Sequence, residues 1–381
     1  MTVLRLGILF STSGDYAAMG RDCRDGAMLA IEELQGRDGF AIEPIIADPG
    51  GSASRYMDLA RTMLVTQGCR HILGTVTSQA RKDVIPVVEK YDGQLWYVCP
   101  YEGFEANPSV IYTGGCPNQH LVPLFAHLLP TYGGRVYLAG ANYVWGWEMN
   151  RLARELVTQA GGEIAGERCL PIGDTDVGLI TGDIAEQRPD FILSNLIGPS
   201  SHAFLQAMRR LGQQDRSFKP ERCPVVSCDL TECELGEIGL GVADGQLATA
   251  AYFDSVDGPQ NMALKALVAA RFGAGRRLSS FFATSYATVH LCFQAISRSG
   301  SDDPARVRAS LARITTESPI GPLAIDPATN HAALPFLLGR IAGDRFEIIQ
   351  SQPKLAADPY LTARQPSRPA VGKRPNLRVV S

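Results

Sequence analysis

Short apolar segments alternate with amphipathic helical segments along most of this chain. Residues 4–10 and 41–47 have the composition of buried strands, and residues 16–34 between them carry apolar side chains at helical spacing. The same alternation resumes from 118 to 227. Strands that alternate with helices form βαβ units with parallel sheets. Because 381 residues exceed what one hydrophobic core usually supports, we predict an α/β protein of two doubly wound parallel-sheet lobes.

Composition and charge limit the partners that such a chain can have. Apolar residues make up 45% of the sequence and charged residues 20%, as in an ordinary soluble globular protein. The formal net charge is −3 and the arginines are scattered, so we expect no direct contact with nucleic acid. No stretch reaches the roughly 18 apolar residues that a membrane-spanning helix needs, so we also expect no membrane span.

The N-terminus and the cysteines predict a compartment. Residues 1–5 lead directly into the first predicted strand, without the basic segment, long apolar core and cleavage site of a secretory leader. Nine cysteines, an odd number, are spread between Cys23 and Cys292 without close pairs. This pattern suits a reducing compartment better than a disulfide framework. We therefore expect a cytoplasmic protein, unless the sequence begins after a removed leader.

The sequence signatures of catalysis that we sought are missing. There is no Gly-x-x-x-x-Gly-Lys-Ser/Thr loop, no three-glycine dinucleotide fingerprint after the first strand and no Gly-x-Ser-x-Gly nucleophile elbow. Cys223, Cys228 and Cys233 recur at five-residue spacing, which is not that of a zinc site. Cys99 follows a strand but has no base nearby in sequence. We predict that the protein is not an enzyme and holds neither a cofactor nor a metal.

Polar side chains gather where the predicted strands end. Ser78 lies near the start of a predicted helix just after the strand 71–74, and Tyr97 and Cys99 lie at the end of the next strand. Ligands of open parallel sheets bind outside these carboxyl ends, and a helix N-terminus adds free N–H groups. Ser78 is therefore either a ligand contact or only an N-cap, and the sequence leaves both open.

The second predicted lobe offers matching strand ends. Tyr143 follows the strand 135–139 and is either a ligand contact or an aromatic residue on the rim. Uncharged polar groups with aromatic walls are typical of a small-molecule pocket. The remaining candidates of this lobe follow its next two strands and are residues 195–199, Asp229, Thr231 and Glu232.

Several short motifs resemble those of one known family, and the resemblance covers almost the whole chain. They are Arg81-Lys82, Ile85-Pro86-Val87-Val88-Glu89, Pro100-Tyr101-Glu102-Gly103-Phe104-Glu105, Pro117-Asn118-Gln119, Ala141-Asn142-Tyr143, Gly245-Gln246, Tyr252-Phe253 and Asp358-Pro359-Tyr360. The chain is similar to the amide receptors of bacterial amidase operons, which regulate those operons negatively and have the type I periplasmic-binding-protein fold. Those receptors are related to the urea and branched-chain amino-acid binding proteins.

The resemblance implies two lobes that are joined by hinge crossovers and close on a ligand. In the amide receptors, a serine at the position of Ser78 and tyrosines at the positions of Tyr97 and Tyr143 hold the amide. This chain departs from them at Cys99, where they have a threonine, and at Val76, where they have a tyrosine. The ligand contacts that we predict are Val76, Ser78, Tyr97, Cys99, Pro100, Tyr143, Gly198 and Thr231.

The resemblance also implies a division of the chain. We expect residues 1–117 and 252–328 in an N-terminal lobe, residues 118–251 and 329–361 in a C-terminal lobe, and a loose tail over 362–381. Segments from distant parts of the sequence would then share a lobe, as hinge crossovers require.

Two functions follow from the resemblance. The first is a cytoplasmic sensor for a small neutral amide or urea-like molecule, which regulates gene expression through an antiterminator-type protein partner. The second is the solute-binding protein of an ABC transporter for urea, amides or branched-chain amino acids. An amino acid would also need an acid for its ammonium group, which Asp229 or Glu232 could supply. We favour the sensor because no leader is visible, and a homo-oligomer is consistent with either function.

Overall fold

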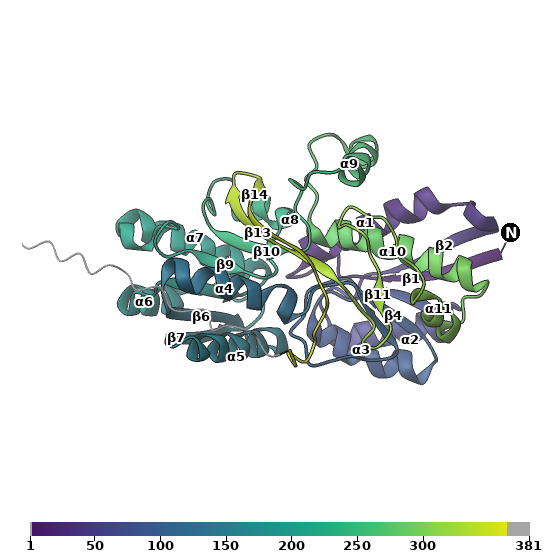
Figure 1. Ribbon diagram of the computed structural model, residues 1–381, viewed down its shortest axis with the longest axis horizontal. Coiled ribbons are helices and arrows are strands. Elements are labelled where there is room, and N and C mark those ends of the chain that lie inside the picture. The colour runs from purple at the N-terminus through teal and green to yellow at the C-terminus, as the bar shows by residue number, and fades with distance from the viewer. Residues whose placement is uncertain (1, 364–381) are drawn as a thin grey trace, which may run out of the picture.

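The chain folds around two seven-stranded sheets, one in each of two lobes that lie side by side (Figure 1). The structure is a computed structural model and describes residues 2–363. The first sheet contains β1 (Thr2–Leu9), β2 (Phe40–Ala47), β3 (His71–Gly74), β4 (Gln94–Tyr97), β5 (Val110–Tyr112), β11 (Ile325–Asp326) and β12 (His331–Ala332). The second contains β6 (Arg135–Ala141), β7 (Glu163–Leu170), β8 (Phe191–Asn195), β9 (Val225–Ser227), β10 (Leu247–Ala250), β13 (Leu334–Ala342) and β14 (Arg345–Leu355).

Both sheets repeat one strand order. The first runs β2-β1-β3-β4-β5 and the second β7-β6-β8-β9-β10, with every neighbouring pair in these runs parallel. Two further strands complete each sheet. β12 pairs parallel with β5, whereas β11 pairs antiparallel with β12, β13 with β10 and β14 with β13. The order is that of a doubly wound sheet. The predicted fold of two doubly wound parallel-sheet lobes is therefore confirmed.

Helices cover both faces of each sheet because their apolar stripes pack against strands that are buried on both sides. In the first lobe α1 (Ala17–Leu34) packs with α10 (Ser280–Ser299), and α2 (Ala53–Val65) packs with α3 (Ser78–Lys90). In the second lobe α4 (Leu121–Tyr132) packs with α5 (Val144–Gln159), and α6 (Gly178–Gln187) with α7 (Gly198–Gln214). The remaining helices are α8 (Glu232–Ile238), α9 (Pro259–Phe272) and α11 (Pro304–Leu311).

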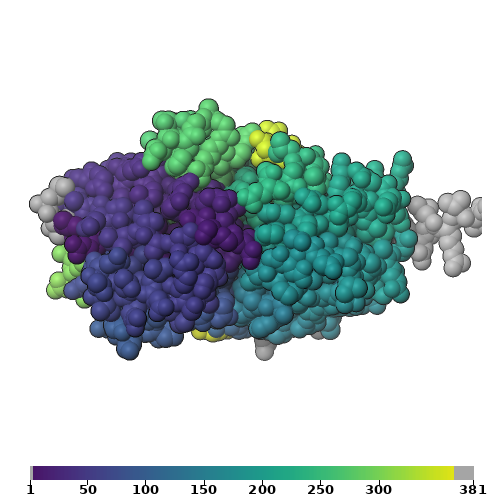
Figure 2. Space-filling model, turned by 180° about the vertical axis from the view of Figure 1, so that it is seen from behind, coloured from purple at the N-terminus to yellow at the C-terminus, as the bar shows by residue number. Residues whose placement is uncertain are grey.

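The chain passes between the two sheets three times. The passages lie between β5 and α4, after β10, and between β12 and β13. Figure 2 shows the N-terminal segments (purple to blue) and the middle of the chain (teal) as two bodies pressed against each other. We propose the lobe boundaries predicted above, with one refinement: His331 and Ala332 pair with the first sheet, so that lobe extends beyond residue 328.

One further detail differs from the sequence-based expectations, and another lies outside the described residues. We expected residues 108–112 to form an edge strand, but β5 is internal, because β12 pairs with it on its other side. The two residues of β12 are too few to give a recognisable pattern. The predicted loose tail over 362–381 lies outside the described residues from position 364 onward.

Candidate functional site

The loops at the carboxyl ends of the two sheets face each other across the boundary between the lobes. In a doubly wound sheet the ligand crevice lies where the strand order reverses, which here is between β1 and β3 and between β6 and β8. Residues from both reversals line one pocket of about 30 Å³, which we call the switch-point pocket. Its lining residues are Met19, Val76, Thr77, Ser78, Cys99, Pro100, Tyr143, Trp145, Ile197, Asp229 and Phe281.

Several helices begin at this pocket. Thr77 is the N-cap of α3 and accepts a hydrogen bond from the Ala80 N–H at 3.3 Å. Tyr143 and Ile197 occupy the N-cap positions of α5 and α7, and neither gives a side-chain cap. The first N–H groups of a helix have no partner within the helix, and the helix dipole makes this end attractive to negative charge. Tyr143 and Ile197 both line the switch-point pocket, so the starts of α5 and α7 lie beside it. In α7 the Gly198 N–H is bonded to the Glu234 carboxylate and Pro199 has no N–H, so free donors are expected only from α5.

Ser78 is the first residue of α3 and not its cap, and its hydroxyl belongs to a buried network. Ser78 Oγ donates to the Glu102 carboxylate and accepts a hydrogen bond from Arg81 Nη1 at 3.2 Å. Arg81 also pairs with Glu102 at 3.0 Å and with Glu105 at 2.8 Å. Because the single hydroxyl proton points to Glu102, Ser78 Oγ has only a lone pair left for a ligand. Ligand contact by Ser78 stays a prediction.

Arg81 is fully buried and lies between two aromatic rings, with its guanidinium carbon 4.7 Å from the Tyr97 ring centre and 4.6 Å from that of Tyr101. Burial raises the pKa of the Glu105 carboxyl, but the charge and hydrogen bond of Arg81, the Lys82 charge and the Tyr112 hydroxyl together outweigh it and lower the pKa to about 2. The family motif that contains Glu102 and Glu105 is thus an internal ionic anchor that ties α3 to the loop after β4.

The other predicted contacts of the first lobe differ in their access to the pocket. Val76, Cys99 and Pro100 line the switch-point pocket, and the Cys99 thiol donates to the Thr75 carbonyl at 3.5 Å. Tyr97 does not line it. The Tyr97 side chain is fully buried and its hydroxyl donates to the Val76 carbonyl at 2.9 Å. The structure thus gives Tyr97 a supporting position behind the pocket wall.

In the second lobe Tyr143 lines the switch-point pocket, whereas Thr231 and Gly198 lie elsewhere. Thr231 lines a neighbouring pocket that is described below. Gly198 has a φ of +54° and sits against the first lobe, and a Cβ at this position would lie 1.9 Å from the Asp15 carbonyl oxygen. Gly198 is thus a point of close approach between the lobes and lines neither pocket.

Asp229 is the acid of the pocket. It is buried and follows β9, and the Ser227 hydroxyl donates to its carboxylate at 2.5 Å. No lysine or arginine is among the described residues that line the switch-point pocket. Burial raises the pKa of the Asp229 carboxyl to about 7. The sequence offered Asp229 only as one of two acids for an ammonium group. The other, Glu232, instead accepts a hydrogen bond from the Asp254 backbone N–H at 2.7 Å.

Trp145 is a pocket residue for which the sequence favoured packing over ligand contact. Its side chain is only 3% exposed and lines the switch-point pocket, and its Nε1 has no hydrogen-bond partner within the described structure. A buried tryptophan N–H usually finds a partner. The signal in the sequence was its place one residue inside a helix that follows a strand, but packing is the commoner role for tryptophan there.

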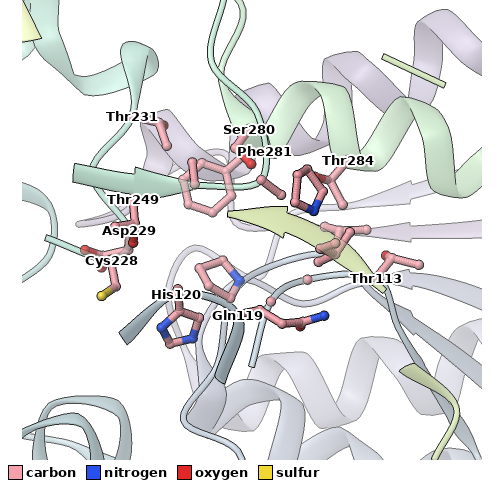
Figure 3. Close-up of a pocket in the computed structure, with 18 residues that line it drawn as sticks. Thr113, Gln119, His120, Cys228, Asp229, Thr231, Thr249, Ser280, Phe281 and Thr284 are labelled. Atoms are coloured by element: carbon pink, nitrogen blue, oxygen red, sulfur yellow. The ribbon is translucent and has the colours of Figure 1, made fainter. Parts of the chain in front are cut away.

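A second pocket of about 30 Å³ lies against the three passages between the sheets, and we call it the hinge pocket (Figure 3). It shares Pro100, Asp229 and Phe281 with the switch-point pocket. In Figure 3, Cys228, Asp229 and Thr249 lie on one side, Thr113 and Thr284 on the other, and Gln119 and His120 below. Burial lowers the pKa of His120 to about 4, so this ring is neutral near pH 7.

Residues 2–363 contain neither a metal site nor a membrane-spanning helix. No group of three or more histidine, cysteine, aspartate or glutamate side chains in this range could hold a metal ion. No helix in the same range combines the length and the apolar character needed to cross a bilayer.

The chain is similar to proteins that bind small solutes. It is 22% identical over 348 residues to a Leu/Ile/Val-binding protein homologue of Brucella abortus, covering 89% of this chain and 88% of that protein. It is also 22% identical over 332 residues to a leucine-, isoleucine-, valine-, threonine- and alanine-binding protein of Pseudomonas aeruginosa, covering 85% of this chain and 86% of that protein.

Solved structures share the fold. A solute-binding protein of an ABC transporter from R. palustris, solved in complex with 4-hydroxybenzoate, superimposes with a TM-score of 0.83 at 22% identity, covering 93% of this chain and 98% of that one. A leucine-binding protein from Thermotoga maritima gives a TM-score of 0.77 at 16% identity, with 91% and 98% covered.

The family model described as "Periplasmic binding protein domain" matches residues 4–366. This match and the relatives above correct one expectation: the predicted cytoplasmic location is wrong, because such proteins serve transport outside the cytoplasm. The first residues of a sequence and a count of cysteines are weak signals of compartment, since a leader is removed from the mature protein. The strand order, the pocket between the lobes and the match over nearly the whole length agree, and the chain belongs to the periplasmic binding protein family.

Proposed function

We propose that this chain is the solute-binding protein of an ABC uptake transporter and captures a small polar solute between its lobes in the periplasm. The observation that carries the proposal is the switch-point pocket, which is lined by the N-cap residue of α5, by Trp145 with its unpartnered N–H and by the buried Asp229. Donors and an acid of this kind bind and orient a ligand. No group there suggests that it also transforms the ligand, and we propose binding without catalysis.

The arrangement favours a ligand with both an acceptor group and N–H groups. A carboxylate or an amide carbonyl can accept from the N-terminus of α5 and from Trp145 Nε1. An ammonium group or an amide NH₂ can donate to Asp229. Small amino acids with branched apolar side chains, simple amides and urea meet both requirements. A benzoate lacks the N–H group, and Asp229 would then lie beside a carboxylate without a cation to separate the two charges.

Closure of the lobes would couple binding to delivery. A ligand that touches Ser78 or Cys99 in the first lobe and Tyr143 or Asp229 in the second stabilises the closed arrangement only as far as it binds that arrangement better. The transporter would then recognise the closed form. Tyr97 would act from behind the wall, by holding the Val76 carbonyl.

The amide receptors are the second candidate for the ligand chemistry. The motif Pro100–Glu105 favours them, because its acids form the network that fixes the Ser78 hydroxyl. An antiterminator-type partner would need access to transcription, which a periplasmic protein does not have, so we do not propose one. A homo-oligomer stays a prediction.

A thermal-shift screen of the purified protein tests the proposal. The probes are valine, isobutyramide, urea and 4-hydroxybenzoate, each at millimolar concentration. A ligand at about 1,000 times its Kd stabilises a protein by roughly 4 kcal/mol. We expect at least one of the first three probes to raise Tm strongly, and the Asp229→Asn variant to lose that shift. A shift with 4-hydroxybenzoate alone would contradict the assignment of Asp229, and no shift with any probe would contradict the proposed ligand class.

A further inference from the structure

The hinge pocket continues the switch-point pocket toward the passages between the sheets. Asp229, Pro100 and Phe281 line both, so a molecule beside the Asp229 carboxylate contacts the two spaces at once. Apolar side chains form much of the wall of the hinge pocket and polar groups stand at a few points in it. The apolar lining residues are Val98, Pro100, Ala250, Ala251, Phe281, Leu334 and Pro335.

Two polar atoms of the hinge pocket have no nitrogen or oxygen hydrogen-bond partner in the described part of the chain. They are Nδ1 of His120 and Oγ1 of Thr249, whose residues are 4% and 1% exposed. His120 Nε2 lies 3.2 Å from the Tyr101 carbonyl oxygen, which can only accept. The single proton of the neutral ring therefore sits on Nε2, and Nδ1 is a free acceptor. The nearest group to the Thr249 hydroxyl is the Cys228 thiol, whose pKa is raised overall by burial although a hydrogen bond from Thr249 lowers it. A thiol is only a weak partner, and a ligand oxygen or nitrogen can replace it.

Two neighbouring polar side chains of the pocket, Gln119 and Thr113, already have hydrogen-bond partners. Gln119 Nε2 donates to the carbonyls of Ala332 and Leu355, and its Oε1 accepts from the Cys116 N–H. Thr113 Oγ1 pairs with the Thr288 hydroxyl at 2.7 Å. His120 and Thr249 thus differ from these two neighbours. A buried polar group without a partner costs stability, and a ligand that pairs with it recovers that cost on binding.

We propose that the hinge pocket is a second ligand subsite, in which His120 Nδ1 and Thr249 Oγ1 bind a neutral hydroxyl or carboxamide at the end of a solute whose head group lies in the switch-point pocket. This inference rests on the proposed function and adds a ligand class to it: small solutes with two polar ends and a short apolar stretch between them. An anionic end group is excluded, since no described lysine or arginine lines the hinge pocket and His120 is neutral. A hydroxyl or an amide N–H can donate to His120 Nδ1, and the Thr249 hydroxyl can donate or accept.

Isosteric ligand pairs test the subsite. Threonine and valine differ only by a hydroxyl in place of a methyl group, as do lactamide and isobutyramide. We expect the polar member of the pair that binds to bind about tenfold more tightly than its apolar partner, measured by calorimetry, because it fills a hydrogen bond that the apolar member leaves empty.

The Thr249→Val variant keeps the shape of the side chain and removes its hydroxyl. We expect it to abolish most of the preference for the polar member while leaving the affinity for the apolar member unchanged. The matched control is Thr329→Val, because Thr329 Oγ1 is also buried without a partner but lines neither pocket. The Tm of the ligand-free Thr249→Val protein is expected to stay the same or rise, since an unpaired hydroxyl is removed.

The outcomes separate the two proposals. Tight binding of valine or isobutyramide with no gain for the polar partner would overturn the subsite and leave the proposed function standing. A large fall in Tm for Thr249→Val but not for Thr329→Val would mean that the Thr249 hydroxyl is structural, which also overturns the subsite. If neither these four compounds nor urea binds, the proposed ligand class is contradicted, and the subsite falls with it.

Discussion

The most consequential single residue of the site is Asp229. It is a buried carboxyl with one neutral hydrogen-bonding neighbour, Ser227, and it lies where the two pockets meet. Burial without a cation disfavours the ionised form, which raises the pKa from an ordinary 3.8 to about 7. The ionised carboxyl therefore lowers the stability of the ligand-free protein, and it can pair with a ligand that brings an ammonium or amide N–H group.

The pH dependence of folding reports this cost. A raised pKa in the folded state means that the folded protein holds the proton more tightly, so Asp229 lowers stability as pH rises from about 4 to 7. We expect Asp229→Asn to be more stable than the parent at pH 8, by up to ~4 kcal/mol. The difference should shrink to nothing near pH 4. Denaturant unfolding across this range measures it, and a constant difference would contradict the assignment.

Trp145 offers a second test at this scale. Trp145→Phe removes an N–H that has no partner in the ligand-free protein and also shrinks a core side chain, so we expect a loss of stability of about 1 kcal/mol and an affinity for the best probe that falls about tenfold. Trp147→Phe is the matched control. Trp147 is 52% exposed and its Nε1 donates to Asn142, outside the pockets. Equal losses in the two variants would argue against a ligand contact.

Individual site residues could be predicted only where the residue type and its position after a predicted strand indicate a role. Ser78 was identified because it is a polar residue that follows a strand, but the N-cap of α3 is its neighbour Thr77. Nothing in the sequence shows that Glu102 takes the Ser78 proton. Ile197 looks like a core residue, and only the fold reveals it as an N-cap without a side-chain oxygen. Hydrogen-bond direction is a three-dimensional property.

At the scale of elements, α3 is held by more than its apolar stripe. Arg81 on this helix is fully buried and binds Glu102 and Glu105 on the loop after β4. Removing one partner of a buried ion pair leaves an uncompensated charge. We expect Arg81→Met to lower the free energy of unfolding by about 3–5 kcal/mol, measured by denaturant titration. Arg61→Met on the exposed face of α2 is the control, and equal effects of the two variants would contradict the anchor.

The elements themselves were largely predictable. Residues 71–74 form the predicted strand β3, and the predicted helix after it begins at Ser78, because an apolar segment followed by polar residues indicates these boundaries. The short helix α8 and the strand β12 escaped prediction. Each is too short to show a period, and β12 exists because β5 offers it a free edge. The position of β12 thus depends on its pairing with a distant strand, which a local sequence pattern does not show.

For the whole molecule, a close contact between the lobes at Gly198 limits how far they can close around the pocket. The Asp15 carbonyl lies against Gly198 at a distance that leaves no room for a Cβ. We therefore expect Gly198→Ala to hold the lobes apart and weaken the best probe by at least tenfold, with a modest fall in Tm of the free protein because a φ of +54° strains an alanine. Small-angle scattering with saturating ligand should show a larger radius than the parent. Gly182→Ala in α6 is the control, since no atom lies within 4 Å of a Cβ there.

The three passages of the chain between the sheets also determine the order in which the protein can be assembled. The first sheet is complete only when His331 and Ala332 pair with β5, and α10 covers α1 from the other end of the sequence. Neither lobe is therefore a contiguous stretch that could finish folding while a ribosome still holds the rest. Such a chain stays unfinished until almost all of it has been synthesised, a property that suits export through a channel that admits only unfolded polypeptide.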